Sequence, residues 1–159
     1  LVFFFIALLS TGIMTGIFFT WTNAVRSGIG KLNDLSYLNA LQSMNRVILN
    51  PLFYLAFFAP TLSLVFSAVF GYKAVSGYLF QLILAATIFY IAGVFLVTLF
   101  GNIPLNNLLE NSDLSGFTPE DAKKLRDKIE IKWNHFNLVR TISSFSSFVL
   151  IIVVCLLYK

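Results

Sequence analysis

The chain has 159 residues, of which 58% are hydrophobic and only 11% are charged, and its mean hydropathy is +0.84. Because an ordinary soluble domain is roughly a quarter charged, a water-soluble globule is a poor fit to this composition. A single Cys excludes an internal disulfide and a thiolate metal cage, and a single His excludes a multi-histidine metal site within this chain. We therefore expect a small integral membrane protein.

The few charges divide the chain into four long apolar runs. Residues 1–25 are uncharged, and further runs lie between Arg46 and Lys73, between Lys73 and Glu110, and after Arg140. A helix of about 20 apolar residues crosses a hydrocarbon core. The sequence therefore predicts an all-α fold, a four-helix membrane bundle that forms one transmembrane domain over residues 1–159. The predicted spans are about residues 1–25, 51–71, 78–100 and 138–158.

Capping sequences mark the starts of the second and fourth helices. Asn50-Pro51 offers an N-cap followed by a first-turn proline, so the second span should begin there. Thr118-Pro119-Glu120-Asp121 is a capping-box pattern, and no Gly or Pro follows it in the chain. The fourth helix is therefore predicted to begin near residue 119, well before its apolar run, and to project beyond the bilayer.

The third span is predicted to end near Phe100. Gly101 and Pro104 follow directly, and both residues oppose continuation of a helix. Residues 101–109 are therefore expected to be uncharged chain just outside the span.

The segment between the first two spans has the pattern of an amphipathic helix. Gln42 and Asn45 are three residues apart and share one helical face. Apolar side chains recur at helical spacing on the same segment, at Leu35, Leu38, Leu41 and Ile48. We expect an interfacial helix that lies at the membrane surface.

The positive charges predict the orientation in the membrane. Nine Lys and Arg residues lie in the two larger connections and at the start of the fourth span, while the other side carries only Lys73 and Lys159. The larger connections, residues 26–50 and 101–137, are therefore expected in the cytoplasm, most simply at a bacterial inner membrane. Anionic lipid headgroups account for the net charge of +4, and no basic run points to nucleic acid.

Several kinds of catalytic site are unsupported by the sequence. All seven carboxylates lie outside the apolar runs, which disfavours a proton-coupled transporter. There is no pattern for a Ser-His-Asp triad and no phosphate-binding glycine loop. Any site must be built from amides, hydroxyls, indoles and one or two cations.

The fourth helix carries such groups on one face. Trp133, Asn137, Arg140, Ser144 and Ser147 are spaced by four, three, four and three residues. At helical spacing they fall within about 80° of one another, and polar groups in lipid face the bundle interior. Two interpretations remain open: a hydrogen-bonded seam between helices, or an electropositive pocket with an indole wall.

Three other features are ambiguous. Asn102 and Asn106 flank Pro104, and this cluster fits either a helix stop or an amide pair that hydrogen-bonds a ligand. Trp21, at the end of the first span, is most simply an anchor in the aromatic belt. His135 lies on the opposite face of the fourth helix from the polar stripe and is expected to point elsewhere.

Taken in order, these segments resemble the anthrone oxygenase-like family of small four-span membrane proteins, also called domain of unknown function 1772. The resemblance covers nearly the whole chain. The matching segments are Gly16-Ile17-Phe18-Phe19-Thr20-Trp21, Gln42 with Asn45 and Asn50-Pro51, Asn102-Ile103-Pro104-Leu105-Asn106, and Trp133 with Asn137 and Arg140.

The resemblance implies a four-helix membrane bundle and an oxygenase activity. Characterised fungal relatives oxidise polycyclic anthrones to anthraquinones with molecular oxygen, without a metal or a flavin, so no cofactor is expected. An anthrone enolate needs preorganised donors near its oxyanion, and the candidates are Arg140, Asn137, Asn102 and Asn106. The candidates for binding the rest of the substrate are Trp133, Trp21, Gln42 and Asn45.

Two functional hypotheses follow. The first is a cofactor-free membrane oxidoreductase acting on a lipophilic aromatic substrate. The second is a non-catalytic membrane subunit or a lipophile-binding protein, and the lack of an obvious general base favours it. Expected partners are membrane lipids, a lipophilic aromatic ligand, and either a membrane protein or a second copy of the chain.

Overall fold

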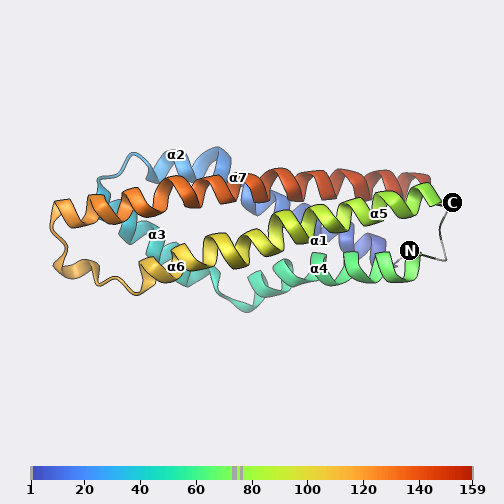
Figure 1. Cartoon of the computed structure of the whole chain (residues 1–159), viewed down its shortest axis with the longest axis horizontal. Coiled ribbons are helices and arrows are strands. Elements are labelled where there is room, and N and C mark those ends of the chain that lie inside the picture. The colour runs from blue at the N-terminus through green and yellow to red at the C-terminus, as the bar shows by residue number, and fades with distance from the viewer. Residues whose placement is uncertain (1, 73–74, 76, 159) are drawn as a thin grey trace.

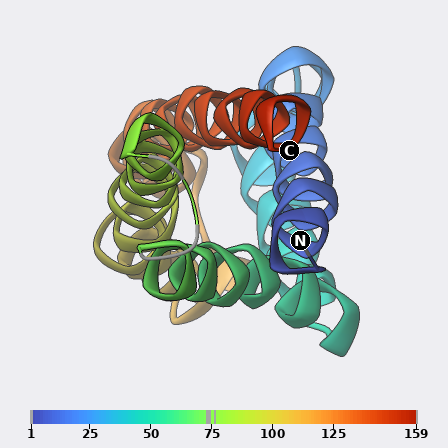
Figure 2. The ribbon, with the colours of Figure 1, turned by 90° about the vertical axis from the view of Figure 1, so that its right-hand side faces the viewer.

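The structure, a computed structural model, describes residues 2–72, 75 and 77–158, and its regular elements are all helical. Four helices are long and apolar enough to cross a membrane: Val2–Ile29, Pro51–Gly71, Gly77–Glu110 and Pro119–Leu157. They run side by side in an elongated bundle (Figure 1) and surround a common axis when viewed from one end (Figure 2). The predicted all-α membrane bundle is confirmed. Lys73 and Lys159, used above to predict orientation, lie outside the described residues.

The first spanning helix continues past residue 25, where it was expected to end. It consists of α1 (Val2–Thr20), a π-helical turn η1 (Trp21–Val25) and α2 (Arg26–Ile29). The chain then turns into α3 (Asp34–Ile48), which Asn33 caps by accepting a hydrogen bond from the Ser36 N–H at 2.9 Å.

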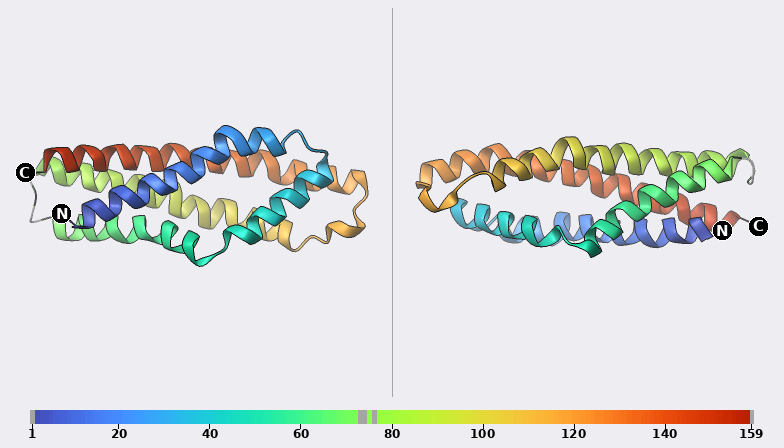
Figure 3. Two further views of the ribbon diagram at one scale, coloured as in Figure 1. Left: turned by 180° about the vertical axis from the view of Figure 1, so that it is seen from behind. Right: turned by 90° about the horizontal axis from the view of Figure 1, so that it is seen from below.

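Helix α3 is the predicted amphipathic helix, and the face that it buries packs on protein. Its buried residues are Tyr37, Leu38, Leu41 and Gln42. They contact the N-terminal part of the fourth spanning helix and the C-terminal end of the third. Helix α3 runs beside both of these helix ends (Figure 3). The last turn of α3 remains exposed, with Val47 and Ile48 both open.

Helix α4 (Pro51–Gly71) has the length expected of a single membrane span. It begins where the sequence predicts, because Asn50 accepts a hydrogen bond from the Phe53 N–H at 3.0 Å and Pro51 occupies the first turn. Its 21 residues span about 30 Å, the thickness of a hydrocarbon core. We therefore expect Pro51 to lie at one boundary of the apolar layer.

The third spanning helix does not end at Phe100, so this prediction is wrong. It runs without a break through α5 (Gly77–Tyr90), two π-helical segments, η2 (Ile91–Leu96) and η3 (Thr98–Asn102), and α6 (Ile103–Glu110). In η3 the Ile103 N–H bonds the carbonyl of Thr98, five residues back. This change of register places Pro104 in the first turn of α6, where a missing N–H is tolerated.

Two glycines let this helix approach the fourth one closely. A Cβ atom on Gly93 would overlap the Ser143 side chain, and one on Gly101 would lie 2.9 Å from the Phe136 ring. Gly101, which was expected to end the helix, instead lets it pack against its neighbour.

Helix α7 (Pro119–Leu157) is the long fourth helix. The predicted capping box is confirmed: the Asp121 N–H donates to the Thr118 hydroxyl oxygen, and the Thr118 N–H donates to the Asp121 carboxylate, both at 3.2 Å. The Thr118 hydroxyl also donates to the Asp121 carboxylate at 2.6 Å, and this bond and that of the Thr118 N–H hold the pKa of Asp121 below its usual range. With 39 residues against 21 in α4, α7 projects well beyond the apolar layer.

The part of the protein that extends beyond the apolar layer, here called the projecting part, has its own hydrophobic core. Side chains from α3, α6, α7 and the short helix η4 (Leu114–Gly116) form it: Tyr37, Leu38, Leu41, Leu109, Leu114, Ala122, Leu125, Ile129 and Trp133. A second core lies deeper in the bundle and contains Met14, Phe18, Phe57, Leu64 and Tyr90 among others. The four ion pairs of the described residues all belong to the projecting part.

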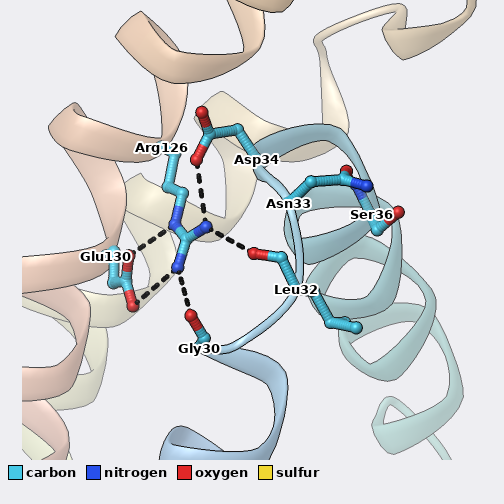
Figure 4. Close-up of polar contacts among 7 residues, drawn as sticks. All are labelled: Gly30, Leu32, Asn33, Asp34, Ser36, Arg126 and Glu130. Carbon is cyan, nitrogen blue, oxygen red and sulfur yellow. Dashed lines mark hydrogen bonds and ion pairs between the residues drawn. The ribbon is translucent and has the colours of Figure 1, made fainter.

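Arg126 ties the loop after α2 to α7 (Figure 4). Its guanidinium donates to Glu130 at 2.6 Å and to Asp34 at 3.0 Å, and to the backbone carbonyls of Gly30 and Leu32, both at 2.9 Å. The Glu130 hydrogen bond raises the pKa of Arg126, so the guanidinium stays charged. Only 13% of its side chain is exposed, so these bonds are partly shielded from water.

We expect Arg126→Gln to lower the stability of the projecting part, because the two loop carbonyls and two carboxylates lose a shared charged donor. The expected loss is about 1–3 kcal/mol of unfolding free energy. Thermal unfolding followed by circular dichroism in lipid nanodiscs measures it. Lys128→Gln removes an exposed charge from the same helix and is the matched control. Equal melting temperatures for the two variants would contradict the assigned role of Arg126.

Candidate functional site

A cavity of about 550 Å³ lies between the two hydrophobic cores. Its walls come from the end of the first spanning helix, the C-terminal half of α3, the start of α4, the segment from η2 to α6, and α7. The lining residues of α4 lie between Phe53 and Phe58, two to seven residues after Pro51. At 1.5 Å per residue this is about 3–11 Å below the boundary of the apolar layer.

Seven of the eight residues predicted for the site line this one cavity. They are Trp21, Asn45, Asn102, Asn106, Trp133, Asn137 and Arg140. The fold brings them together from three spanning helices and α3. Gln42 is the exception, because its amide donates to the backbone carbonyl of Leu109 at 3.0 Å and so caps the end of α6. Gln42 lines a separate polar groove beside Arg46 and Glu110.

Arg140 is a buried cation with neutral partners. Only 6% of the residue is exposed, and its guanidinium donates to the Asn137 amide oxygen at 2.8 Å and to the Thr98 hydroxyl at 3.3 Å. The guanidinium carbon lies 4.5 Å from the centre of the Phe18 ring and 5.4 Å from that of Trp133. No Asp or Glu lines the cavity, and the Nε atom has no partner among the described residues. A buried cation without a counter-ion favours binding of an anion.

Asn137 holds Arg140 in place. Its amide oxygen accepts the Arg140 hydrogen bond, and its amide nitrogen donates to the Phe18 carbonyl at 3.1 Å and to the Thr22 hydroxyl at 2.9 Å. Because both ends of the amide are occupied, Asn137 has no free N–H for direct contact with an oxyanion. It acts as a positioning residue that links Arg140 to the first spanning helix.

The two tryptophans form an indole wall whose orientation is fixed by amides. The ring centres of Trp21 and Trp133 lie 4.3 Å apart, and their ring planes are inclined by 47°. Trp133 Nε1 donates to the Asn106 amide oxygen at 2.7 Å, and Trp21 Nε1 donates to that of Asn134 at 2.9 Å. Asn134 was not expected at the site, because on the helix it lies about 100° from Trp133, outside the arc of the polar stripe.

Two cavity amides have unpartnered atoms. The Asn102 amide nitrogen donates to the Trp133 carbonyl at 3.4 Å, and its Oδ1 atom is buried without a partner among the described residues. The Nδ2 atom of Asn45 is likewise buried and unpaired in this part of the chain. Both unpaired atoms have almost no accessible surface, although their residues line the cavity. The Asn102–Asn106 cluster does not stop the helix.

The polar stripe on α7 divides into two parts. All five of its residues are buried, as expected for an inward face. The first three line the cavity, while Ser147 donates to the Ala86 carbonyl of α5 at 2.9 Å and Ser144 bonds within its own helix. A pocket and a helix-to-helix seam are therefore both present. His135 is exposed and lies outside the cavity, as expected.

Phenylalanines supply the flat apolar walls. Phe53 and Phe57 stack with ring centres 5.9 Å apart, and Phe57 and Phe95 stack at the same distance. Sequence reasoning missed these residues, because nothing in the pattern distinguishes them among 18 phenylalanines.

One side of the cavity is open. Its lining residues at the α3–α4 junction and on the facing segment from η3 to α6 are exposed: Ile48, Leu49, Tyr54, Leu99 and Ile103. All but Tyr54 are purely aliphatic, so the opening is apolar. At the depth estimated from α4, we expect this opening to face lipid acyl chains close to the membrane surface.

Comparison with known families identifies the chain. A family model described as anthrone oxygenase matches residues 52–150. The chain belongs to the anthrone oxygenase family. The matched region contains Asn102, Asn106, Trp133 and Arg140, while Trp21 and Asn45 precede it. No significant match was found among curated proteins or among solved structures.

The opening can be tested by fluorescence, because the only two tryptophans of the chain line the cavity. In nanodiscs, lipids brominated on their acyl chains are expected to quench Trp emission more strongly than aqueous acrylamide does. Adding a Trp at the exposed Ile131 of the projecting part gives a matched acrylamide-sensitive control. Strong acrylamide quenching with none by bromolipid would show that the cavity opens to water instead.

Proposed function

We propose that this membrane protein is an oxygenase that binds a flat lipophilic aromatic substrate as its enolate and promotes its oxidation by molecular oxygen. The observation that carries the proposal is the buried Arg140 guanidinium, held by neutral groups in an aromatic-walled cavity. Membership of the anthrone oxygenase family supports an anthrone as the substrate class.

Arg140 would act on the acidity of the substrate. An anthrone carries a methylene group whose deprotonation gives an enolate, with its negative charge largely on oxygen. A cation in a low-dielectric site stabilises this oxyanion more than it stabilises the neutral ketone, so it lowers the pKa of the bound methylene. Asn137 would keep the guanidinium aimed at the oxyanion without contacting it.

A conventional general base is missing from the described part of the cavity wall. None of the described residues that line it is Asp, Glu or His. In this proposal the proton passes to water at the mouth of the cavity, which lies close to the membrane surface. The protein then contributes electrostatic stabilisation and orientation instead of proton abstraction.

The oxidation balances without a further reactant. The enolate carbon donates electrons to O2 and forms a carbon–oxygen bond, giving a peroxide that takes up one proton. Loss of the remaining hydrogen from that carbon, with cleavage of the O–O bond, yields the new carbonyl and one water. Overall, a methylene and O2 become a carbonyl and water.

A second candidate function is binding without turnover. The absence of a carboxylate or imidazole among the cavity-lining residues favours it, because Arg140 would then hold a lipophilic anion that undergoes no reaction. The protein would be a lipophile carrier or a subunit of a larger membrane assembly. Tight binding of an anthrone with no acceleration of O2 uptake would distinguish this function from the first.

We further propose that residues 26–50 and 101–137 face the cytoplasm at a bacterial inner membrane. Arg140 is buried inside the bundle and no longer counts toward either side. The other eight Lys and Arg residues lie within residues 26–50 and 101–137 of the sequence. This asymmetry supports the orientation through the positive-inside rule.

Activity is tested with purified protein in nanodiscs by anthrone-dependent O2 uptake and by the absorbance of the quinone formed. We expect a rate above that of empty nanodiscs, which corrects for spontaneous oxidation. Arg140→Gln should reduce kcat by about a hundredfold, because the oxyanion loses its cation. Arg46→Gln, which removes an exposed cation paired with Glu110 outside the cavity, should leave the rate unchanged. Equal rates for wild type and Arg140→Gln would rule out the proposal.

A further inference from the structure

A polar groove of about 600 Å³ lies on the projecting part, outside the cavity. One face of α3 forms one of its walls, and residues 110–115, from the end of α6 to the start of η4, form the other. Helices α3 and α6 lie beside each other there (Figure 1). The groove and the cavity share no lining residue, so the proposed oxidation gives the groove no role.

Gln42 provides the groove with a hydrogen-bond acceptor. The residue is only 9% exposed, and its Nε2 atom donates to the backbone carbonyl of Leu109 at 3.0 Å. This bond fixes the amide, because turning it over would bring two oxygens together. The Oε1 atom accepts no hydrogen bond from the described residues, and it is not one of their enclosed unpaired atoms, so a ligand can reach it. This acceptor favours a ligand group that carries N–H or O–H donors.

The groove also carries charges of both signs. Arg46 Nε donates to both carboxylate oxygens of Glu110, at 2.8 and 3.0 Å, while its two terminal nitrogens have no partner among the described residues. Asp113 Oδ1 accepts hydrogen bonds from the Ser115 hydroxyl and N–H, which hold the pKa of Asp113 below its usual range. The groove therefore offers two guanidinium nitrogens to an anion, and a carboxylate beside the Gln42 oxygen to a cation.

The two kinds of charge lie at different distances from the membrane. Arg46 is five residues before Pro51, and the intervening Val47 and Leu49 are apolar and exposed. Headgroups add about 5–8 Å on each side of the hydrocarbon core, so we expect Arg46 to lie at their level. Gln42 lies one helical turn, about 6 Å, further from the core along α3. This order of apolar side chains, cation and acceptors matches the order of acyl chains, phosphate and amine in a phospholipid.

We infer that the groove binds the headgroup of phosphatidylethanolamine, with its phosphate at Arg46 and its ammonium at Gln42 and Asp113. The short ethanolamine arm carries the ammonium about one helical turn away from the phosphate. An ammonium brings the positive charge that suits Asp113 and the N–H donors that suit the Gln42 oxygen. Phosphatidylcholine has the same charges but no N–H donor, and phosphatidylglycerol has no positive charge. A lipid bound in this way would join α3 to the loop after α6.

Native mass spectrometry of the purified, delipidated chain tests the inference by resolving single bound lipids. Phosphatidylethanolamine, phosphatidylcholine and phosphatidylglycerol with identical acyl chains are compared. We expect phosphatidylethanolamine to bind about tenfold more tightly than either of the others, because one hydrogen bond to a charged group contributes about that factor. Equal affinities for the ethanolamine and choline lipids would overturn the inference, and so would a preference for phosphatidylglycerol.

A substitution in the groove locates the bound lipid. Asp113→Asn removes the negative charge but keeps an oxygen for the Ser115 bonds, and it should weaken phosphatidylethanolamine binding about threefold. Asp127→Asn is the matched control, because Asp127 is an exposed carboxylate of α7 outside the groove, and it should leave the affinity unchanged. Equal affinities of the two variants would overturn the groove as the binding site.

The wild-type lipid series decides the inference even if Asp113→Asn fails to fold. No anthrone enters these measurements, and the groove lies outside the cavity. Loss of the lipid preference would therefore leave the proposed oxidation standing, and an inactive protein would leave the lipid preference standing.

Discussion

The buried guanidinium of Arg140 is the constraint on which the site depends. A cation inside an apolar bundle is unfavourable unless its hydrogen bonds and its charge are met. The protein supplies neutral acceptors on Asn137 and Thr98 and the ring faces of Phe18 and Trp133. These contacts hold three spanning helices around one group. None of the described cavity-lining residues is a counter-ion for Arg140. The positive charge therefore favours an anionic group on a ligand that enters the cavity.

The path of the third spanning helix decides what faces this cation. Had the helix ended at Phe100, Asn102 and Asn106 would lie in a loop outside the bundle. The π-helical turns instead carry the helix through Pro104, so these two amides lie one turn apart on its inner face. Asn106 accepts from the Trp133 indole, and Asn102 donates to the Trp133 carbonyl. A local departure from α-helical register thus adds two amides of the third spanning helix to the wall of the cavity.

Local chemistry in the sequence predicts the helices and most of the site residues, but not their contacts. Uncharged runs, caps and helical spacing predict the spans and the inward orientation of Trp133, Asn137 and Arg140. These features can be predicted because they depend on residues that are neighbours in sequence. The continuation of a helix through Pro104 depends on a register change that composition does not reveal. Gln42 shares a face with Asn45, yet it caps α6 because of long-range packing.

The most direct test of this account is an anaerobic titration of anthrone bound to the protein in nanodiscs, followed by the absorbance of the enolate. The account predicts that the enolate appears at a pH at least about one unit lower than in empty nanodiscs, because a cation within a few ångströms favours the anion. A midpoint equal to or higher than that in empty nanodiscs would contradict the claim that the cavity stabilises a lipophilic oxyanion.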